Sequence, residues 1–80
     1  MTYMFEVYYR PPEDPEKEAS LAERVSHLGG RLDYREVPIE GRPGGACLTF
    51  EFHDIERARA AAETLRAQGE YVEGPVEDGP

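Results

Sequence analysis

Apolar and polar residues alternate in two stretches of the chain, which is the pattern of a strand with one buried face. In residues 3–9 the apolar residues occupy the odd positions, and in residues 46–52 they occupy the even positions. Two shorter extended runs lie at residues 32–39 and 71–73, the first with a break of alternation near its proline. The pattern therefore predicts four strands.

Two segments between these strands carry apolar residues at helical spacing, so that one stripe of each helix faces a core. The first helix is expected to begin at Asp14-Pro15, because aspartate accepts hydrogen bonds from free N–H groups and proline fits the first helical position. Gly29-Gly30 closes it, since glycine accepts the left-handed conformation common at helix ends. The second helix is expected between Asp54 and Gly69.

The order of these elements is βαββαβ, which predicts an α+β, ferredoxin-like fold. In that fold a four-stranded antiparallel sheet of order 4-1-3-2 carries two helices on one face. Pro38 and Pro75 flank the two expected edge strands, where proline is tolerated. Residues 1–80 are interpreted as a single domain, with a hairpin connection at residues 41–45 and an acidic tail at residues 74–80 that frays.

The same periodicities predict which residues fill the core between the helices and the sheet. The expected core is Phe5, Val7, Tyr9, Leu21, Val25, Leu28, Leu32, Leu48, Phe50, Phe52, Ala58, Ala61, Ala62 and Leu65.

Charge and size narrow the possible functions. The chain has 80 residues and a net charge of −8, from 17 acidic and 9 basic side chains. A chain this short builds one modest core, so function is expected on a surface, a groove or a subunit interface. The basic residues are dispersed, and an acidic chain repels a phosphate backbone, which argues against a nucleic-acid partner.

Cysteine content and hydropathy bear on where the protein works. Cys47 is the single cysteine, so no intrachain disulfide can form, which is typical of a reducing compartment. The N-terminal residues lack the charged and apolar regions of a signal peptide, and no apolar run approaches the length of a membrane span. We therefore expect a soluble, cytoplasmic protein without a membrane partner.

With both helices on one face, the other face of the sheet is expected to be open and to serve as a binding or dimer surface. Its central strands should contribute eight residues: Met4, Glu6, Tyr8, Arg10, Cys47, Thr49, Glu51 and His53.

Several activities known on this architecture need residues that these positions lack. RNA recognition motifs stack bases on aromatic side chains of the two central strands. Here the third strand offers Cys47, Thr49 and Glu51, and Tyr8 is the one aromatic residue among the eight. Acylphosphatases hold phosphate in a glycine-rich loop, but residues 11–15 contain three prolines and two acids.

Metal binding and nucleophilic catalysis are two further functions to consider for residues of the third predicted strand. Cys47, Glu51 and His53 share one side of that strand and are metal-ligand types. A polar, partly solvated face or a dimer contact is the simpler interpretation, so no metal and no cofactor is expected. Cys47 and His53 are separated by roughly 20 Å of extended strand, too far for a direct catalytic pair.

The stretch from Ala22 to Leu32, with Gly29-Gly30 between helix and strand, resembles the helix-to-second-strand passage of ACT-type domains. These are small βαββαβ modules that bind amino acids at subunit interfaces. The resemblance covers about a dozen residues, and the glycine-containing turn before the first helix of those domains is missing here. It implies a regulatory, ligand-binding role.

Together these features predict a non-enzymatic binding or regulatory module that acts as a homodimer and takes a small-molecule or protein partner. The open face and two edge strands on a small core motivate the dimer. No residue is assigned a catalytic role. The alternative is a cofactor-free enzyme with a site in a dimer-interface cavity, lined by His53 and by tyrosines: Tyr3, Tyr8, Tyr9, Tyr34 and Tyr71.

Overall fold

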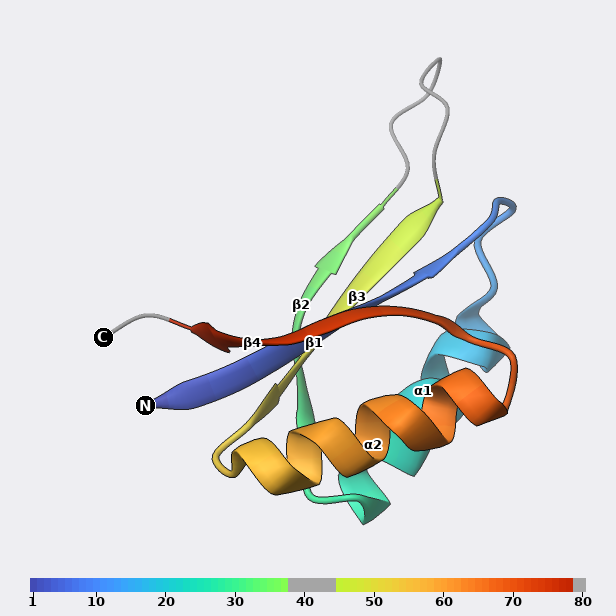
Figure 1. Cartoon of the computed structure of the whole chain (residues 1–80). Coiled ribbons are helices and arrows are strands. Elements are labelled where there is room, and N and C mark those ends of the chain that lie inside the picture. The colour runs from blue at the N-terminus through green and yellow to red at the C-terminus, as the bar shows by residue number, and fades with distance from the viewer. Residues whose placement is uncertain (38–44, 79–80) are drawn as a thin grey trace.

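The computed structural model describes residues 1–37 and 45–78, and these form an α+β fold (Figure 1). The strands make one antiparallel sheet of order β2-β3-β1-β4, and both helices lie against the same face of it. Read from the other edge, the strand order is 4-1-3-2. The predicted α+β class is confirmed. The elements are β1 (Thr2–Tyr9), α1 (Pro15–His27), β2 (Arg31–Glu36), β3 (Ala46–Phe52), α2 (Ile55–Ala67) and β4 (Tyr71–Asp78).

Both helices begin and end where the capping residues predict. The Asp14 carboxylate accepts a hydrogen bond from the Lys17 backbone N–H at 3.0 Å, and the Asp54 carboxylate accepts one from the Glu56 N–H at 2.8 Å. Gly29 follows α1 with a φ of 95°, in the left-handed region that favours glycine. Among the described residues, neither helix is long and apolar enough to cross a membrane.

The core lies between the helices and the odd face of β1. Phe5 packs against Phe50 and Phe52 with ring centroids 5.9 and 5.3 Å apart, and leucines, valines and alanines of both helices close over them. Eleven of the expected core residues are buried: Phe5, Val7, Leu21, Val25, Leu48, Phe50, Phe52, Ala58, Ala61, Ala62 and Leu65.

Three expected core residues are not buried, which corrects the prediction. Tyr9 and Leu28 are half-buried at the margins of the core, and Leu32 is 40% exposed. Leu32 lies on the edge strand β2, all of whose residues are exposed. Leu32 pairs with Phe50 and so lies on the core side of the sheet, but on this edge strand 40% of its surface stays exposed.

The last strand is longer than the sequence pattern indicates. Residues 74–78 belong to β4, which pairs with β1 up to Asp78, so they are not a frayed tail. The register shifts between Met4 and Glu6, where β4 has one residue more than β1. A bulge therefore accommodates Gly74 and Pro75, since an extra unpaired residue tolerates a missing N–H. Pro75 lies within an edge strand and does not flank it.

The second strand ends earlier than expected, at Glu36. The predicted continuation through Pro38 and Ile39, and the hairpin connection at residues 41–44, lie outside the described residues.

A polar network joins α1 to the sheet at the β2 side. The Glu18 carboxylate, in a residue only 9% exposed, accepts hydrogen bonds from the Tyr9 hydroxyl and from the Arg35 guanidinium, whose Nη2 lies 3.0 Å from Oε2. The Tyr9 hydroxyl in turn accepts the Asp14 backbone N–H at 2.9 Å. Arg35 holds the pKa of Glu18 below its ordinary value. The network fixes the start of α1 against two strands.

Candidate functional site on the open sheet face

The sheet face away from the helices is built from alternate residues of the paired strands. Met4, Glu6 and Tyr8 of β1 lie opposite Glu51, Thr49 and Cys47 of β3, respectively, and no described helix covers them (Figure 1). Six of the eight residues predicted for this face are therefore neighbours in the sheet.

The other two predicted residues do not belong to the paired part of the face. Arg10 follows the end of β1 and His53 follows the end of β3, and both side chains are exposed. Each continues the alternation of its strand by one step, but lies beyond the residues through which β1 and β3 pair.

The edge strands add residues to the face that the sequence pattern did not assign there. Tyr34 of β2 pairs with Thr49, and on β4 Tyr71 pairs with Tyr8 and Glu73 with Glu6. Tyr8 is therefore not the only aromatic residue of this face. The contribution of β4 was missed because its last residues carry no clear alternation, since the bulge shifts Val76 into line with Met4.

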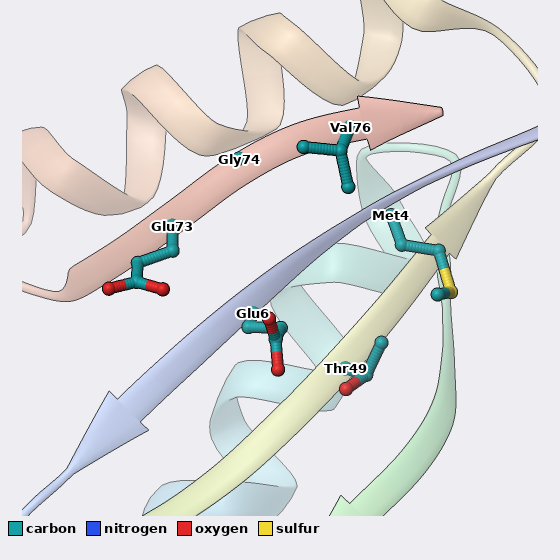
Figure 2. Close-up of a pocket in the computed structure, with 6 residues that line it drawn as sticks. All are labelled: Met4, Glu6, Thr49, Glu73, Gly74 and Val76. Atoms are coloured by element: carbon teal, nitrogen blue, oxygen red, sulfur yellow. The ribbon is translucent and has the colours of Figure 1, made fainter. Parts of the chain in front are cut away.

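A shallow pocket of about 420 Å³ lies over β1 and β4 on this face (Figure 2). Its lining combines two carboxylates, one hydroxyl and two apolar side chains around a glycine. The lining residues are Met4, Glu6, Thr49, Glu73, Gly74 and Val76.

The two carboxylates of the pocket belong to cross-strand partners on β1 and β4, and each is directed to a different hydrogen-bond donor. Glu6 accepts a hydrogen bond from the Cys47 thiol at 3.3 Å, and Glu73 accepts one from the Tyr71 hydroxyl at 3.1 Å. Within the described residues, no ion pair involves either carboxylate: the ion pairs of this face and its edge join Arg31 to other acids. The pocket is therefore a site of uncompensated negative charge.

The hydroxyl of the pocket belongs to Thr49, which is only 8% exposed. It makes no side-chain hydrogen bond within the described part of the chain, and no fully buried polar atom there lacks a partner. The hydroxyl therefore reaches solvent through the pocket that it lines.

The Cys47 thiol and the Tyr8 hydroxyl, beside the pocket, both have raised pKa values. Burial raises the pKa of the Cys47 thiol to about 11, and the carboxylate of Glu6 adds to this shift. Burial also raises the pKa of the Tyr8 hydroxyl, with further contributions from Cys47, Glu6 and Glu73. Both groups are protonated at neutral pH, so neither is an activated nucleophile or base.

A second depression of about 320 Å³ lies at the end of β1, lined by Tyr8, Tyr9, Arg10, Gly45 and Tyr71. Tyr8 and Tyr71 meet edge to face, with centroids 5.8 Å apart. A Cβ atom at Gly45 would lie 1.6 Å from the Tyr9 carbonyl oxygen, so only glycine permits this approach of the two strands. His53 lines neither depression.

The candidate metal ligands do not form a cluster. Glu51 pairs with the Arg31 guanidinium at 2.8 Å, and His53 lies beyond the end of the strand. In residues 1–37 and 45–78, no three histidine, cysteine or acidic side chains are grouped as metal ligands would be. The geometry thus gives the alternative of a Cys47, Glu51 and His53 site no support.

No model of a known protein family matches this chain, and no curated protein is significantly similar to it. The resemblance of residues 22–32 to ACT-type domains therefore has no support from these comparisons.

Proposed function

We propose that this protein is a non-enzymatic binding module of the cytoplasm, that it has a ferredoxin-like fold, and that it acts as a homodimer whose open sheet faces bind ligand. The observation that carries the proposal is the pocket on the helix-free face, with its two carboxylates and its solvent-facing hydroxyl. The element order and the strand order support the ferredoxin-like assignment. The single cysteine supports the assignment to the cytoplasm.

Binding is favoured over catalysis by the protonation of the groups nearest the pocket. An enzyme that transfers protons needs a group whose pKa lies near the working pH. The raised pKa values of Cys47 and Tyr8 keep both groups in one protonation state at neutral pH. The alternative, a cofactor-free enzyme that uses His53, gains no support from the position of that residue outside both depressions.

The two edges of the sheet differ in how well they are protected from pairing with another chain. On β4, Pro75 has no N–H to donate, and Arg66 donates hydrogen bonds to the carbonyl oxygens of Val72 and Gly74 at 3.1 and 2.7 Å. On β2 every residue from Arg31 to Glu36 is exposed. Its pairing with β3 shifts register between Leu32 and Tyr34, but β2 contains no proline and none of the described side chains donates to its backbone. An edge strand of this kind is a template for a further strand, so β2 is the edge that we assign to the dimer.

The sequence of β2 is also complementary to itself. If two copies pair antiparallel about an axis between Asp33 and Tyr34, Arg31 lies opposite the partner's Glu36, and the reverse pair forms across the axis. Opposite charges at facing positions stabilise a strand pair. A dimer joined through the open faces would instead bring Glu6 and Glu73 near their own copies, which is unfavourable. The pockets therefore stay accessible in the dimer.

Light scattering behind a sizing column tests the homodimer at tens of micromolar protein. We expect a mass twice the 9.0 kDa of the chain. Arg31→Glu and Glu36→Arg should each give monomers, because each places like charges opposite one another. The double substitution should restore the dimer.

Arg59→Glu, an exposed change on α2, is the matched control and should leave the dimer intact. A wild-type monomer would contradict the homodimer. A dimer that survives both single substitutions would contradict its assignment to β2.

A further inference from the structure

We propose that the pocket over β1 and β4 binds a primary alkylammonium group. This inference rests on the proposed function, because it takes the open face as the binding surface, and it names the chemistry of the ligand. Three independent features of the pocket lead to it: its charge, its hydroxyl and its apolar walls.

The charge of the pocket favours a cation. Glu6 and Glu73 are cross-strand partners on β1 and β4, where facing Cβ atoms lie about 4.5–5.5 Å apart. Like charges at such positions destabilise a strand pair. No arginine or lysine of the described chain pairs with them, so a bound cation would offset this repulsion.

The hydroxyl of Thr49 is a second feature of the pocket, independent of its charge. The residue is buried to more than nine-tenths, and its hydroxyl, which makes no side-chain hydrogen bond in residues 1–37 and 45–78, reaches solvent through the pocket. Figure 2 shows it on the strand next to Glu6, across from Glu73. An ammonium group has three N–H donors and no acceptor. Two carboxylates and one hydroxyl provide one acceptor group for each donor.

The apolar walls explain why the cation should carry an alkyl chain. Met4 and Val76 face each other across the same strand pair, and 62% of Val76 is exposed. A chain of several methylene groups would cover this surface, and methionine adapts its shape to such a contact. The pocket volume of about 420 Å³ is large enough for a short alkylamine.

Other cations fit these acceptors less well. A divalent metal ion takes six or more oxygen ligands, and this pocket supplies two carboxylates and a hydroxyl. A guanidinium group binds best to a single carboxylate in its own plane. An ammonium group can donate to three separate acceptor groups, and here those groups lie on β4, β1 and β3.

The test is a titration of wild-type protein followed by the amide resonances in two-dimensional nuclear magnetic resonance spectra. The probes are pentylammonium chloride, for a free amine, and Nα-acetyl-lysine amide, for a lysine side chain of a protein partner. Pentan-1-ol and sodium chloride are the controls for the alkyl chain and for ionic strength. We expect saturable shifts at Glu6, Thr49, Glu73 and Val76 with millimolar dissociation constants, and none from either control.

Substitutions in the pocket distinguish binding at this site from nonspecific electrostatic attraction of the amine to an acidic protein. Glu6→Gln and Glu73→Gln should each weaken binding about tenfold, as expected for loss of a charge-assisted hydrogen bond. Thr49→Val keeps the side-chain shape and should weaken amine binding by a smaller factor. Glu23→Gln, an exposed acid on α1, is the matched control and should have no effect.

The proposal is overturned if neither amine causes saturable shifts, if pentan-1-ol binds as tightly as pentylammonium, or if calcium chloride shifts the same resonances at lower concentration. It is also overturned if Glu73→Gln, which alters an exposed side chain, binds as tightly as wild type. Light scattering on the same samples keeps the two proposals apart. A dimer that binds no amine refutes the ligand alone, and a monomer that binds amine refutes the homodimer alone.

Discussion

Replacing Glu18 by glutamine removes the charge at the centre of the network between α1 and the sheet. The carboxylate accepts hydrogen bonds from Tyr9 and from two nitrogens of Arg35, and Glu13 lies 3.5 Å from the same guanidinium. Glutamine has nearly the same shape, but its amide nitrogen is a donor that faces other donors. The substitution therefore tests the network without leaving a cavity.

The expected loss follows from the exposure of the two partners. A hydrogen bond to a charged group contributes about 1.5–3 kcal/mol when it is well shielded. Here the Glu18 side chain is 10% exposed but that of Arg35 is 38% exposed, so water screens part of the attraction. We expect a loss of about 1–2 kcal/mol, which for a domain of this size lowers Tm by about 5–15 °C.

The sign of the pH dependence is fixed by the direction of the pKa shift. Hydrogen bonds from Arg35 lower the pKa of Glu18 in the folded protein. A carboxylate with a lowered pKa stabilises the fold above its unfolded pKa, about 4.3. That stabilisation is lost as pH falls through the folded value. The difference between wild type and Glu18→Gln should thus be full at neutral pH and shrink in acid.

Urea denaturation followed by circular dichroism measures this difference at neutral pH and at about pH 3. Glu16→Gln, an exposed change two residues before Glu18 in α1, is the control and should cost less than about 0.5 kcal/mol. A Glu18→Gln loss that equals the control, or that stays constant from neutral pH into acid, would refute the reasoning.

Two further predictions concern the strand contacts around the open face. Gly45→Ala should lower Tm strongly or prevent folding, because its Cβ would lie 1.6 Å from the Tyr9 carbonyl oxygen; a thermal melt like that of wild type would contradict the close approach. Cys47 should react with Ellman's reagent at least about tenfold more slowly in native protein at neutral pH than in urea-unfolded protein, because burial and Glu6 raise its thiol pKa to about 11. Its rate should rise as pH approaches that value, and equal native and unfolded rates at neutral pH would contradict the assignment.

Elements with local signals could be predicted from the sequence. Asp14 and Asp54 cap the helices because their side chains satisfy backbone N–H groups within three residues, a relation that needs no tertiary contact. The alternation of β1 and β3 indicated their buried faces, since a strand covered on one side has a period of two. The open-face positions of Glu6 and Thr49 follow from the same alternation.

Features that depend on pairing between distant residues could not be predicted. The bulge at Gly74 and Pro75 is set by the register against Met4 and Glu6, and it hides the alternation of β4. Val76 was therefore missed as a member of the face, and with it the pocket. Glu73 precedes the bulge, and its alternation with Val72 in the predicted strand was a signal that could have assigned it to this face.

Burial of polar residues was missed for a similar reason. Cys47 and Thr49 were assigned to an open face, yet they are 6% and 8% exposed, since neighbouring side chains on both flanking strands cover them. On a sheet face that no helix covers, the exposure of a residue depends on the size of its cross-strand neighbours. Those neighbours are known only from the register.

A crystal structure of the wild-type protein grown with pentylammonium would test the proposed dimer and the proposed ligand together. We expect two copies joined along β2, with the sheet faces free of the partner. We also expect the amine nitrogen within about 3 Å of Glu6, Glu73 and the Thr49 hydroxyl. An open face covered by the partner's sheet, or an occupied amine site away from this pocket, would contradict these proposals.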